Sequence, residues 1–222
     1  MGTVTILSTT TLNPISLIGE RAGICWGTNI TNPDKNYKRG IDCINANHGR
    51  TLEYVNIELV LEGYSARVIR EWYTHIGGAP TRLQASTRYI DYNNFEYYIP
   101  PTILNNPKAK EIYTDFMHNI SKTEQDLISL DIPKEDVALI LPLGMTTKIV
   151  DKRNLRNLID MSRQRMCTRA YHEFRQLFSD ICTALKNYST EWEYIINTQM
   201  KPKCEVLGYC PEKKSCGRKN KK

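Results

Sequence analysis

The spacing of apolar positions along the chain predicts short strands that alternate with longer helices. Alternating apolar and polar residues, many of them β-branched, are typical of strands and occur over residues 3–9 ("TVTILST"), 53–63 ("EYVNIELVLEG") and 145–150 ("MTTKIV"). No segment of the sequence is repeated. The pattern predicts an α+β fold that is rich in helices.

Helices are predicted where apolar residues recur at every third or fourth position. They are expected over residues 15–26, 40–47, 65–76, 105–131, 133–141 and 153–186, with a polar loop over residues 27–39. The segment 105–131 carries the clearest signals. Asn106 is placed as the cap, Pro107 in the first turn, and an apolar stripe runs from Ile112 through Phe116 to Leu127.

Two segments concentrate hydrogen-bond donors. Residues 74–89 ("THIGGAPTRLQASTRY") follow the amphipathic run "ARVIREWY" and combine two glycines and a proline with histidine, arginine and hydroxyl side chains. Residues 154–176 ("NLRNLIDMSRQRMCTRAYHEFRQ") carry recurring arginines. Because arginine forks match pairs of phosphate or carboxylate oxygens, the two segments together predict a phosphate-bearing ligand held between loop and helix. Taken alone, the second segment also fits the solvated basic face of a helix.

The length of 222 residues suits one generous domain, and no Gly/Ser-rich or Pro-rich linker divides the chain. We expect a single domain over residues 1–200 and a basic, cysteine-containing tail over residues 201–222. Six of the 30 basic residues lie in the last ten positions, "KKSCGRKNKK", and the remaining 24 equal the 24 acidic residues. The charge therefore does not favour nucleic acid as a partner. The tail is expected to be a solvated end, with an electrostatic tether to nucleic acid as the alternative.

The apolar runs and the cysteines bear on location. The runs "VALILPL" and "NIELVLEG" are too short to cross a bilayer, and the start, "MGTVTILSTTTLNP", has neither a secretory nor a myristoylation pattern. Seven cysteines are an odd number, which favours free thiols. The even spacing of Cys204, Cys210 and Cys216 is not that of a structural zinc site. No membrane contact, no metal and a cytoplasmic location are expected.

Five motifs in a fixed order carry a resemblance to a known family. They are "GRTLEY", "IREWYTH", "LQASTRYIDYNNFEYYIPP", "LILPLGMTTK" and "NLRNLIDMSRQRM". Over roughly residues 15–185 the chain resembles the flavin-dependent thymidylate synthases, known as ThyX. The resemblance implies reductive methylation of dUMP to dTMP, with methylenetetrahydrofolate as the one-carbon donor and FAD, reduced by NADPH, as the hydride carrier. It also implies a mixed β-sheet flanked by long helices, in a homotetramer whose active sites are shared between subunits.

The resemblance implies roles for individual residues. For dUMP it indicates Glu71, Gln84, Ser86, Thr87, Arg88, Lys148 and Arg165, with Ser86 and Arg165 as the catalytic pair. For FAD it indicates Glu53, His75, Arg82, Gln84, Asn154, Arg156 and Arg169, and for folate it indicates His48. Arg165 is placed at the pyrimidine ring, where a fixed cation would stabilise charge that builds on the carbonyl groups.

The chain also departs from the family pattern. The family signature is Arg-His-Arg followed after seven residues by Ser, and only His75 remains here, two residues further from Ser86. Arg82 is expected to take the place of one of the two missing signature arginines. Two other functions therefore stay open: hydroxymethylation at the same pyrimidine carbon of a deoxynucleotide, and non-catalytic binding of a nucleotide or nucleic acid.

Overall fold

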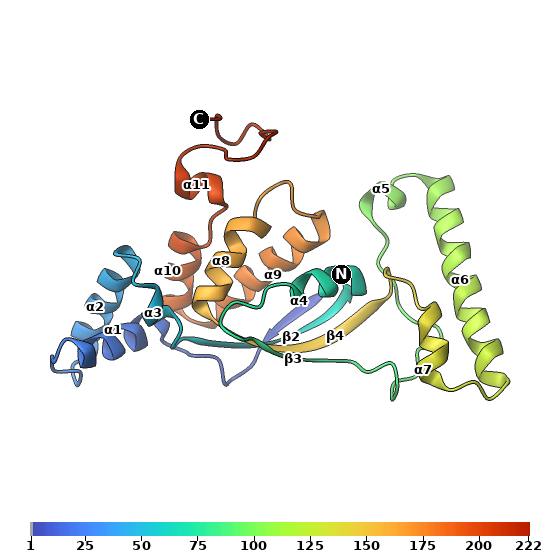
Figure 1. The fold of residues 1–222 in the computed structure, drawn as a ribbon, viewed down its shortest axis with the longest axis horizontal. Helices are drawn as coiled ribbons and strands as arrows, with labels where there is room; N and C mark the ends of the chain where they lie inside the picture. The colour runs from blue at the N-terminus through green and yellow to red at the C-terminus, as the bar shows by residue number, and fades with distance from the viewer. Residues whose placement is uncertain (1) are drawn as a thin grey trace. The chain divides into compact units, whose positions relative to one another are not determined.

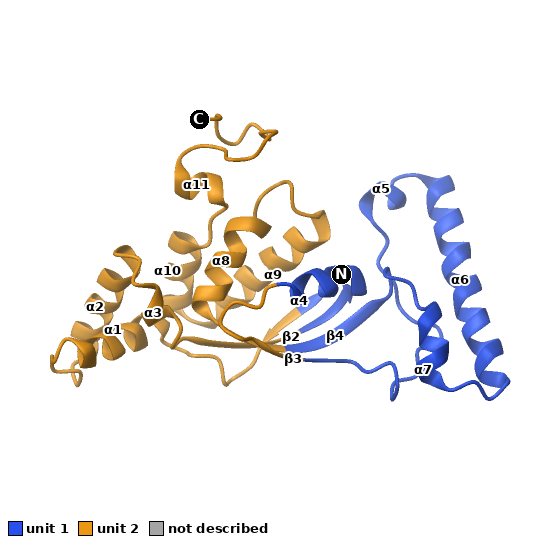
Figure 2. Cartoon of the chain, viewed as in Figure 1, with its two compact units in different colours: residues 1–3, 61–74, 83–150 blue, residues 4–60, 75–82, 151–222 orange. Residues whose placement is uncertain are grey.

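The computed structural model describes residues 2–222 and divides into two compact units (Figure 1, Figure 2). Unit 1 is made of Met1–Thr3, Leu61–Thr74 and Leu83–Val150. Unit 2 is made of Val4–Val60, His75–Arg82 and Asp151–Lys222. The strands β2 (Asn56–Ser65) and β4 (Thr146–Asn154) contribute residues to both units.

The sheet has four strands in the order β1-β2-β4-β3, where β1 is Thr3–Ile6 and β3 is Thr81–Gln84. Along β2, every second side chain from Ile57 to Leu61 is completely buried. Such alternation places one face of a strand against a core, as the sequence pattern predicts. The strands predicted over 53–63 and 145–150 are confirmed with shifted ends. β3 lies in a segment that was predicted to be a loop, and that prediction is wrong.

Unit 2 holds a core of large apolar side chains that includes Trp192, Phe174 and Phe178, all of them fully buried. Its helices are α1 (Pro14–Cys25), α2 (Pro33–Asn45), α3 (Gly49–Leu52), α8 (Leu155–Arg165), α9 (His172–Tyr188), α10 (Thr190–Gln199) and α11 (Lys203–Leu207). The polar loop predicted over 27–39 is wrong from Pro33 onward. There the Asn32 side chain accepts a hydrogen bond from the Lys35 N–H and so caps α2.

The single helix predicted over 153–186 is also wrong. Its first two residues belong to β4, and the chain leaves the helical path between the end of α8 and the start of α9. The Arg175 guanidinium donates to the Ala170 carbonyl at 2.9 Å and also to the Thr168 carbonyl. A side chain thus satisfies backbone acceptors that a continuous helix would have used itself.

Unit 1 contains α4 (Ala66–Tyr73), α5 (Pro101–Leu104), α6 (Pro107–Ser129), α7 (Lys134–Val137) and a 3₁₀ turn, η1 (Ala138–Ile140). The start of α6 is as predicted, because the Asn106 side chain accepts from the Ala109 N–H at 3.1 Å. Its apolar stripe is only partly covered, since Ile112 and Phe116 are 63% and 61% exposed. An uncovered stripe of this kind is typical of a surface that meets another protein surface.

The α+β class is therefore confirmed. Among residues 2–222, none of the helices is both long and apolar enough to span a bilayer. All seven cysteines are free thiols. The tail was predicted to be a solvated end, yet it contains α11, and Cys204 and Cys210 are 8% exposed.

Candidate active site

His75, Arg165 and Phe174 meet in unit 2, although 90 residues separate the first two in the sequence. His75 follows the end of α4, Arg165 ends α8, and Phe174 lies in the first turn of α9. Arg165 Nε donates to His75 Nε2 at 2.9 Å, and the guanidinium carbon lies 4.4 Å from the centre of the Phe174 ring. The histidine and the aromatic ring therefore fix the direction of Arg165.

The imidazole of His75 is neutral in this arrangement. Burial, together with the smaller effect of the positive charges of Arg165 and Arg153, lowers its pKa from 6.5 to about 4. A neutral ring is required for Nε2 to accept a hydrogen bond. The predicted flavin contact His75 and the predicted catalytic Arg165 are thus direct partners.

Glu53 and Arg156, both predicted to contact FAD, are also direct partners in unit 2. Arg156 Nη1 lies 2.6 Å from Glu53 Oε1, and both side chains are partly exposed. A Cβ atom added at Gly49 would lie 3.3 Å from the Arg156 guanidinium carbon, closer than most real contacts of this kind. The glycine that opens the "GRTLEY" motif therefore leaves room for the arginine of the "NLRNL" motif.

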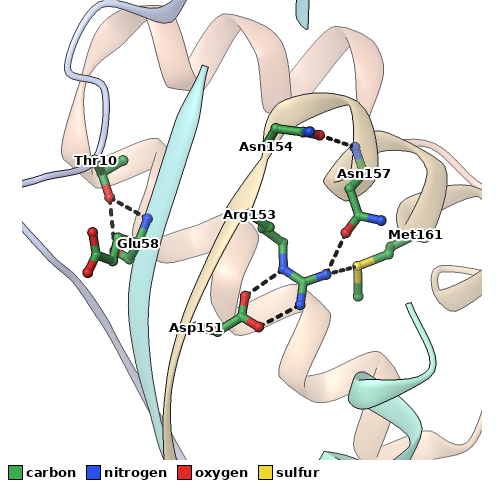
Figure 3. Close-up of polar contacts among 7 residues, drawn as sticks. All are labelled: Thr10, Glu58, Asp151, Arg153, Asn154, Asn157 and Met161. Carbon is green, nitrogen blue, oxygen red and sulfur yellow. Dashed lines mark hydrogen bonds and ion pairs between the residues drawn. The ribbon is translucent and has the colours of Figure 1, made fainter. Parts of the chain in front are cut away.

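Asn154 joins the same region. It caps α8, because its side-chain oxygen accepts from the Asn157 N–H at 2.9 Å (Figure 3). Gly78 has a φ of +73°, and a Cβ atom there would lie 2.2 Å from the Asn154 amide nitrogen. Only glycine suits this conformation and this close approach. Glu53, Gly78 and Asn154 line a cleft of about 200 Å³, together with Lys152 and Arg153.

Arg153, which lines this cleft, forms a buried ion pair with Asp151. The sequence did not predict this ion pair. Arg153 Nε and Nη2 lie 2.6 and 2.8 Å from the two carboxylate oxygens of Asp151, and neither side chain has any exposed surface (Figure 3). Arg153 Nη1 also donates to Asn157 Oδ1 at 2.6 Å and contacts the Met161 sulfur. The signal in the sequence was the spacing "D-x-R" on the face of β4 that carries Ile149 inward.

The residues predicted to bind the dUMP phosphate lie in unit 1. The Arg88 N–H donates to the Ser86 hydroxyl at 3.2 Å, which closes a small turn directly after β3. The Ala85 N–H donates to the Lys148 carbonyl at 2.8 Å, so Lys148 lies on the strand beside this turn. The backbone therefore brings the "STRY" segment and Lys148 to one place.

The side chains in this part of unit 1 are held by acids or hydroxyls. Arg88 Nε lies 2.9 Å from Glu135, Lys148 Nζ lies 3.0 Å from Glu62, and all four side chains are more than half exposed. Exposed pairs of this kind are weak, so an incoming anion can replace the carboxylates. Gln84 Nε2 donates to the Thr147 hydroxyl at 3.4 Å, and Thr87 is half-buried in the same turn.

The other predicted residues are Glu71, Arg82, His48 and Arg169. Glu71 is 3.9 Å from Arg67 on α4. Arg82 is half-buried on β3, and His48 is exposed at the start of α3. Arg169 lies 3.4 Å from Glu212 of the tail. All predicted FAD residues except Gln84 belong to unit 2, whereas all predicted dUMP residues except Arg165 belong to unit 1.

Comparison with known sequences matches this chain to one family. Residues 6–188 match the sequence model of the family described as thymidylate synthase complementing protein. The chain belongs to this family. The membership confirms the resemblance seen in the five motifs, and residues 6–188 include every residue predicted for the site.

Several relatives carry the same description, flavin-dependent thymidylate synthase. The protein of Nitratidesulfovibrio vulgaris is 29% identical over 185 residues, which are 79% of this chain and 73% of that protein. The protein of Clostridium tetani is 27% identical over 98% of this chain and 94% of its own length. The protein of Thermococcus onnurineus is 28% identical over 74% of this chain and 68% of its own length.

Proposed function

We propose that the protein is a flavin-dependent thymidylate synthase that methylates dUMP to dTMP. Methylenetetrahydrofolate supplies the carbon atom and NADPH supplies the reducing equivalents. The observation that carries the proposal is the convergence, in a member of this family, of candidate residues from separate segments of unit 2. These residues are Glu53, His75, Asn154, Arg156 and Arg165.

The cleft beside Gly78 suits part of FAD. Asn154 and Lys152 offer donors, and the glycine lets backbone come close to a ligand. Its volume of about 200 Å³ is below the roughly 300 to 1,000 Å³ of common ligand pockets, so the rest of the cofactor lies outside it. FAD would supply the hydride that reduces the transferred carbon to a methyl group. Glu53, Asn154 and Arg156 would hold the cofactor.

Arg165 is proposed to stabilise the charge that develops on the pyrimidine carbonyl as C5 becomes nucleophilic. The neutral His75 ring and the Phe174 face hold the guanidinium without neutralising it. A cation that is already oriented needs no reorganisation during the reaction. Ser86, Arg88 and Lys148 are proposed to bind the phosphate of dUMP, because their turn and strand present one hydroxyl and two cations together.

We also propose a homotetramer with shared active sites. Two observations support it: the cleft in one chain is too small for the whole cofactor, and α6 exposes Ile112 and Phe116. Sedimentation of the flavin-loaded protein checks the assembly. We further propose that residues 1–200 act as one catalytic domain in the cytoplasm, which the shared strands β2 and β4 and the free thiols support.

The decisive experiment incubates purified protein with FAD, dUMP, methylenetetrahydrofolate and NADPH, followed by mass analysis of the nucleotide. The expected product is dTMP, and the protein should bind FAD with a change in the flavin spectrum. A product heavier by one oxygen atom would identify a hydroxymethylase instead. Protein that binds dUMP but neither FAD nor folate, and forms no product, would be a nucleotide-binding protein.

Replacing Arg88 by alanine should weaken dUMP binding by about 1.5 to 3 kcal/mol, the range for a hydrogen bond to a charged group. The replacement also releases Glu135, whose charge then disfavours the phosphate. Titration calorimetry with dUMP measures the effect. Lys148→Arg serves as the matched control, because it keeps the charge, and it should bind dUMP as the parent does. Unchanged dUMP binding in Arg88→Ala would contradict the role of the "STRY" segment.

A further inference from the structure

A cavity of about 410 Å³ is lined by residues from the C-terminal end of α8, from the segment that follows it and from the tail, residues 201–222, all within unit 2. We call it the tail pocket. Its volume is in the range of small-molecule sites. Residues 201–222 lie beyond residues 6–188, which match the family model, whereas the other wall carries Arg165 and Arg169 of the candidate active site.

The tail is tied to the other wall by specific contacts. Arg169 Nε lies 3.4 Å from Glu212 Oε2, and Arg218 Nη1 donates to the Met166 carbonyl at 3.2 Å. Within the tail, the Cys210 N–H donates to the Asn220 carbonyl at 2.8 Å. These contacts fold the basic segment back over the end of α8 and concentrate its charge at the pocket.

Basic side chains dominate the lining of the tail pocket. They are Arg163, Arg165, Arg169, Lys203, Lys214, Arg218 and Lys219, and the lining has one acid, Glu212. The carboxylates nearest to Arg163 and Arg218 are 3.8 and 3.9 Å away, at the limit of an ion pair. Within residues 2–222, the ammonium groups of Lys203, Lys214 and Lys219 have no ion pair.

Arg163, which lines the tail pocket and also a second cavity beside Arg156, carries a hydrogen-bond donor without a partner. Its Nε atom is buried and finds no hydrogen-bond partner in the part of the chain that the structure describes. A buried donor without a partner is costly, and such groups in native proteins call for an explanation such as a bound ion or ligand. A concave site lined by one sign of charge also attracts the opposite charge strongly.

We propose that the tail pocket binds a small molecule that carries a chain of two or three phosphates. Such a chain offers several negative charges in a small volume, and both arginine forks and lysine ammonium groups bind phosphate oxygens. The lining contains no aromatic side chain on which a base could stack. Recognition therefore rests on the phosphates. A pocket with two walls also favours a small anion over the continuous backbone of a nucleic acid, which needs an open groove.

Cys216 provides a direct reporter for the pocket. Its thiol is exposed and belongs to the lining, and hydrogen bonds with the Thr168 side chain and the Arg218 backbone lower its pKa. A thiol with a lowered pKa is more often the reactive thiolate. A bound phosphate chain would shield Cys216 from iodoacetamide. Cys25 is also exposed and lies outside the pocket, so its alkylation is the internal control.

The test uses full-length protein, saturated with FAD and dUMP, and inorganic tripolyphosphate in titration calorimetry. Tripolyphosphate should bind at least tenfold more tightly than inorganic phosphate, should protect Cys216 but not Cys25, and should bind more weakly as salt is added. The double variant Lys214→Gln, Lys219→Gln should lose at least tenfold in affinity. The matched pair Lys108→Gln, Lys110→Gln on α6 removes two exposed lysines elsewhere and should bind as the parent does.

Three results would overturn the proposal: equal binding by the tail variant and the parent, no binding once FAD and dUMP are both saturating, or binding of a single-stranded oligonucleotide without binding of tripolyphosphate. The second would assign the pocket to the enzymatic site, and the third would assign the tail to nucleic acid. Parallel titration with dTTP identifies the source of the phosphates. Tighter binding of dTTP than of tripolyphosphate indicates a nucleotide, and equal binding indicates that the chain alone is recognised. The outcome does not depend on dTMP formation, and saturation with FAD and dUMP keeps it separate from the enzymatic proposal, because Arg165 and Arg169 also line the pocket.

Discussion

Replacing Arg165 by lysine should slow dTMP formation by about a hundredfold or more, while the protein stays folded and keeps its flavin. In the structure the guanidinium makes two contacts: Nε donates a hydrogen bond to His75, and the guanidinium carbon lies over the Phe174 ring. A lysine ammonium is a compact point charge that cannot make both contacts in the same geometry. The positive charge would remain, but its direction toward the substrate would be lost.

The measurement is the rate of dUMP-dependent oxidation of the reduced flavin under single-turnover conditions. Arg163 lies only two residues from Arg165, but it is unsuitable as a control because both arginines line the same pocket. Arg21→Lys on α1 is a better control, since Arg21 pairs with Glu20 and lies outside every candidate site. Equal loss of rate in Arg165→Lys and Arg21→Lys would show that Arg165 has no specific role.

Removing the carboxylate of Asp151 should lower the free energy of unfolding by about 3 to 5 kcal/mol, the usual result of breaking a fully buried ion pair. Asp151→Ala leaves the Arg153 guanidinium without its two contacts to a carboxylate, and the Arg153 side chain has no exposed surface. Most of the loss comes from that stranded charge. The double variant Asp151→Leu, Arg153→Met should therefore be much more stable than the single variant.

Urea unfolding, followed by circular dichroism, measures the change from the midpoint at constant slope. Asp160→Ala is the control because Asp160 is an exposed acid, 58% accessible and 3.8 Å from Arg163. Its removal should cost less than about 1 kcal/mol. If both single variants lost the same stability, the pair on β4 would contribute no more than a surface contact.

Local signals in the sequence were enough to predict some elements well. The start of α6 follows from the cap at Asn106 and the proline after it, and the core of β2 follows from alternation. The same kind of signal, Asn32 before Pro33, was present at α2 and was overlooked. β3 carries no such pattern, because its "TRLQ" side chains are mostly exposed and its hydrogen bonds go to β4.

In the candidate site, too, some features could be predicted from the sequence and others could not. Motifs indicated the residue types, but not which of them would meet. The contacts Glu53 to Arg156 and His75 to Arg165 join positions about a hundred residues apart, so they depend on the whole fold. Asp151 and Arg153 were hidden because two charged residues normally indicate an exposed strand face. Their mutual neutralisation is what allows them to lie inward.

The tautomer of His75 follows from its contact with Arg165. Because Nε2 accepts the guanidinium N–H, the single proton of the neutral ring resides on Nδ1. If the ring took up a second proton, the Nε2–H donor would face the N–H donor of Arg165, next to the positive charge of the guanidinium. With its pKa near 4, the ring avoids that conflict throughout neutral and mildly acidic conditions. In the proposed mechanism, His75 therefore orients the Arg165 cation and is poorly suited to exchanging protons with the substrate.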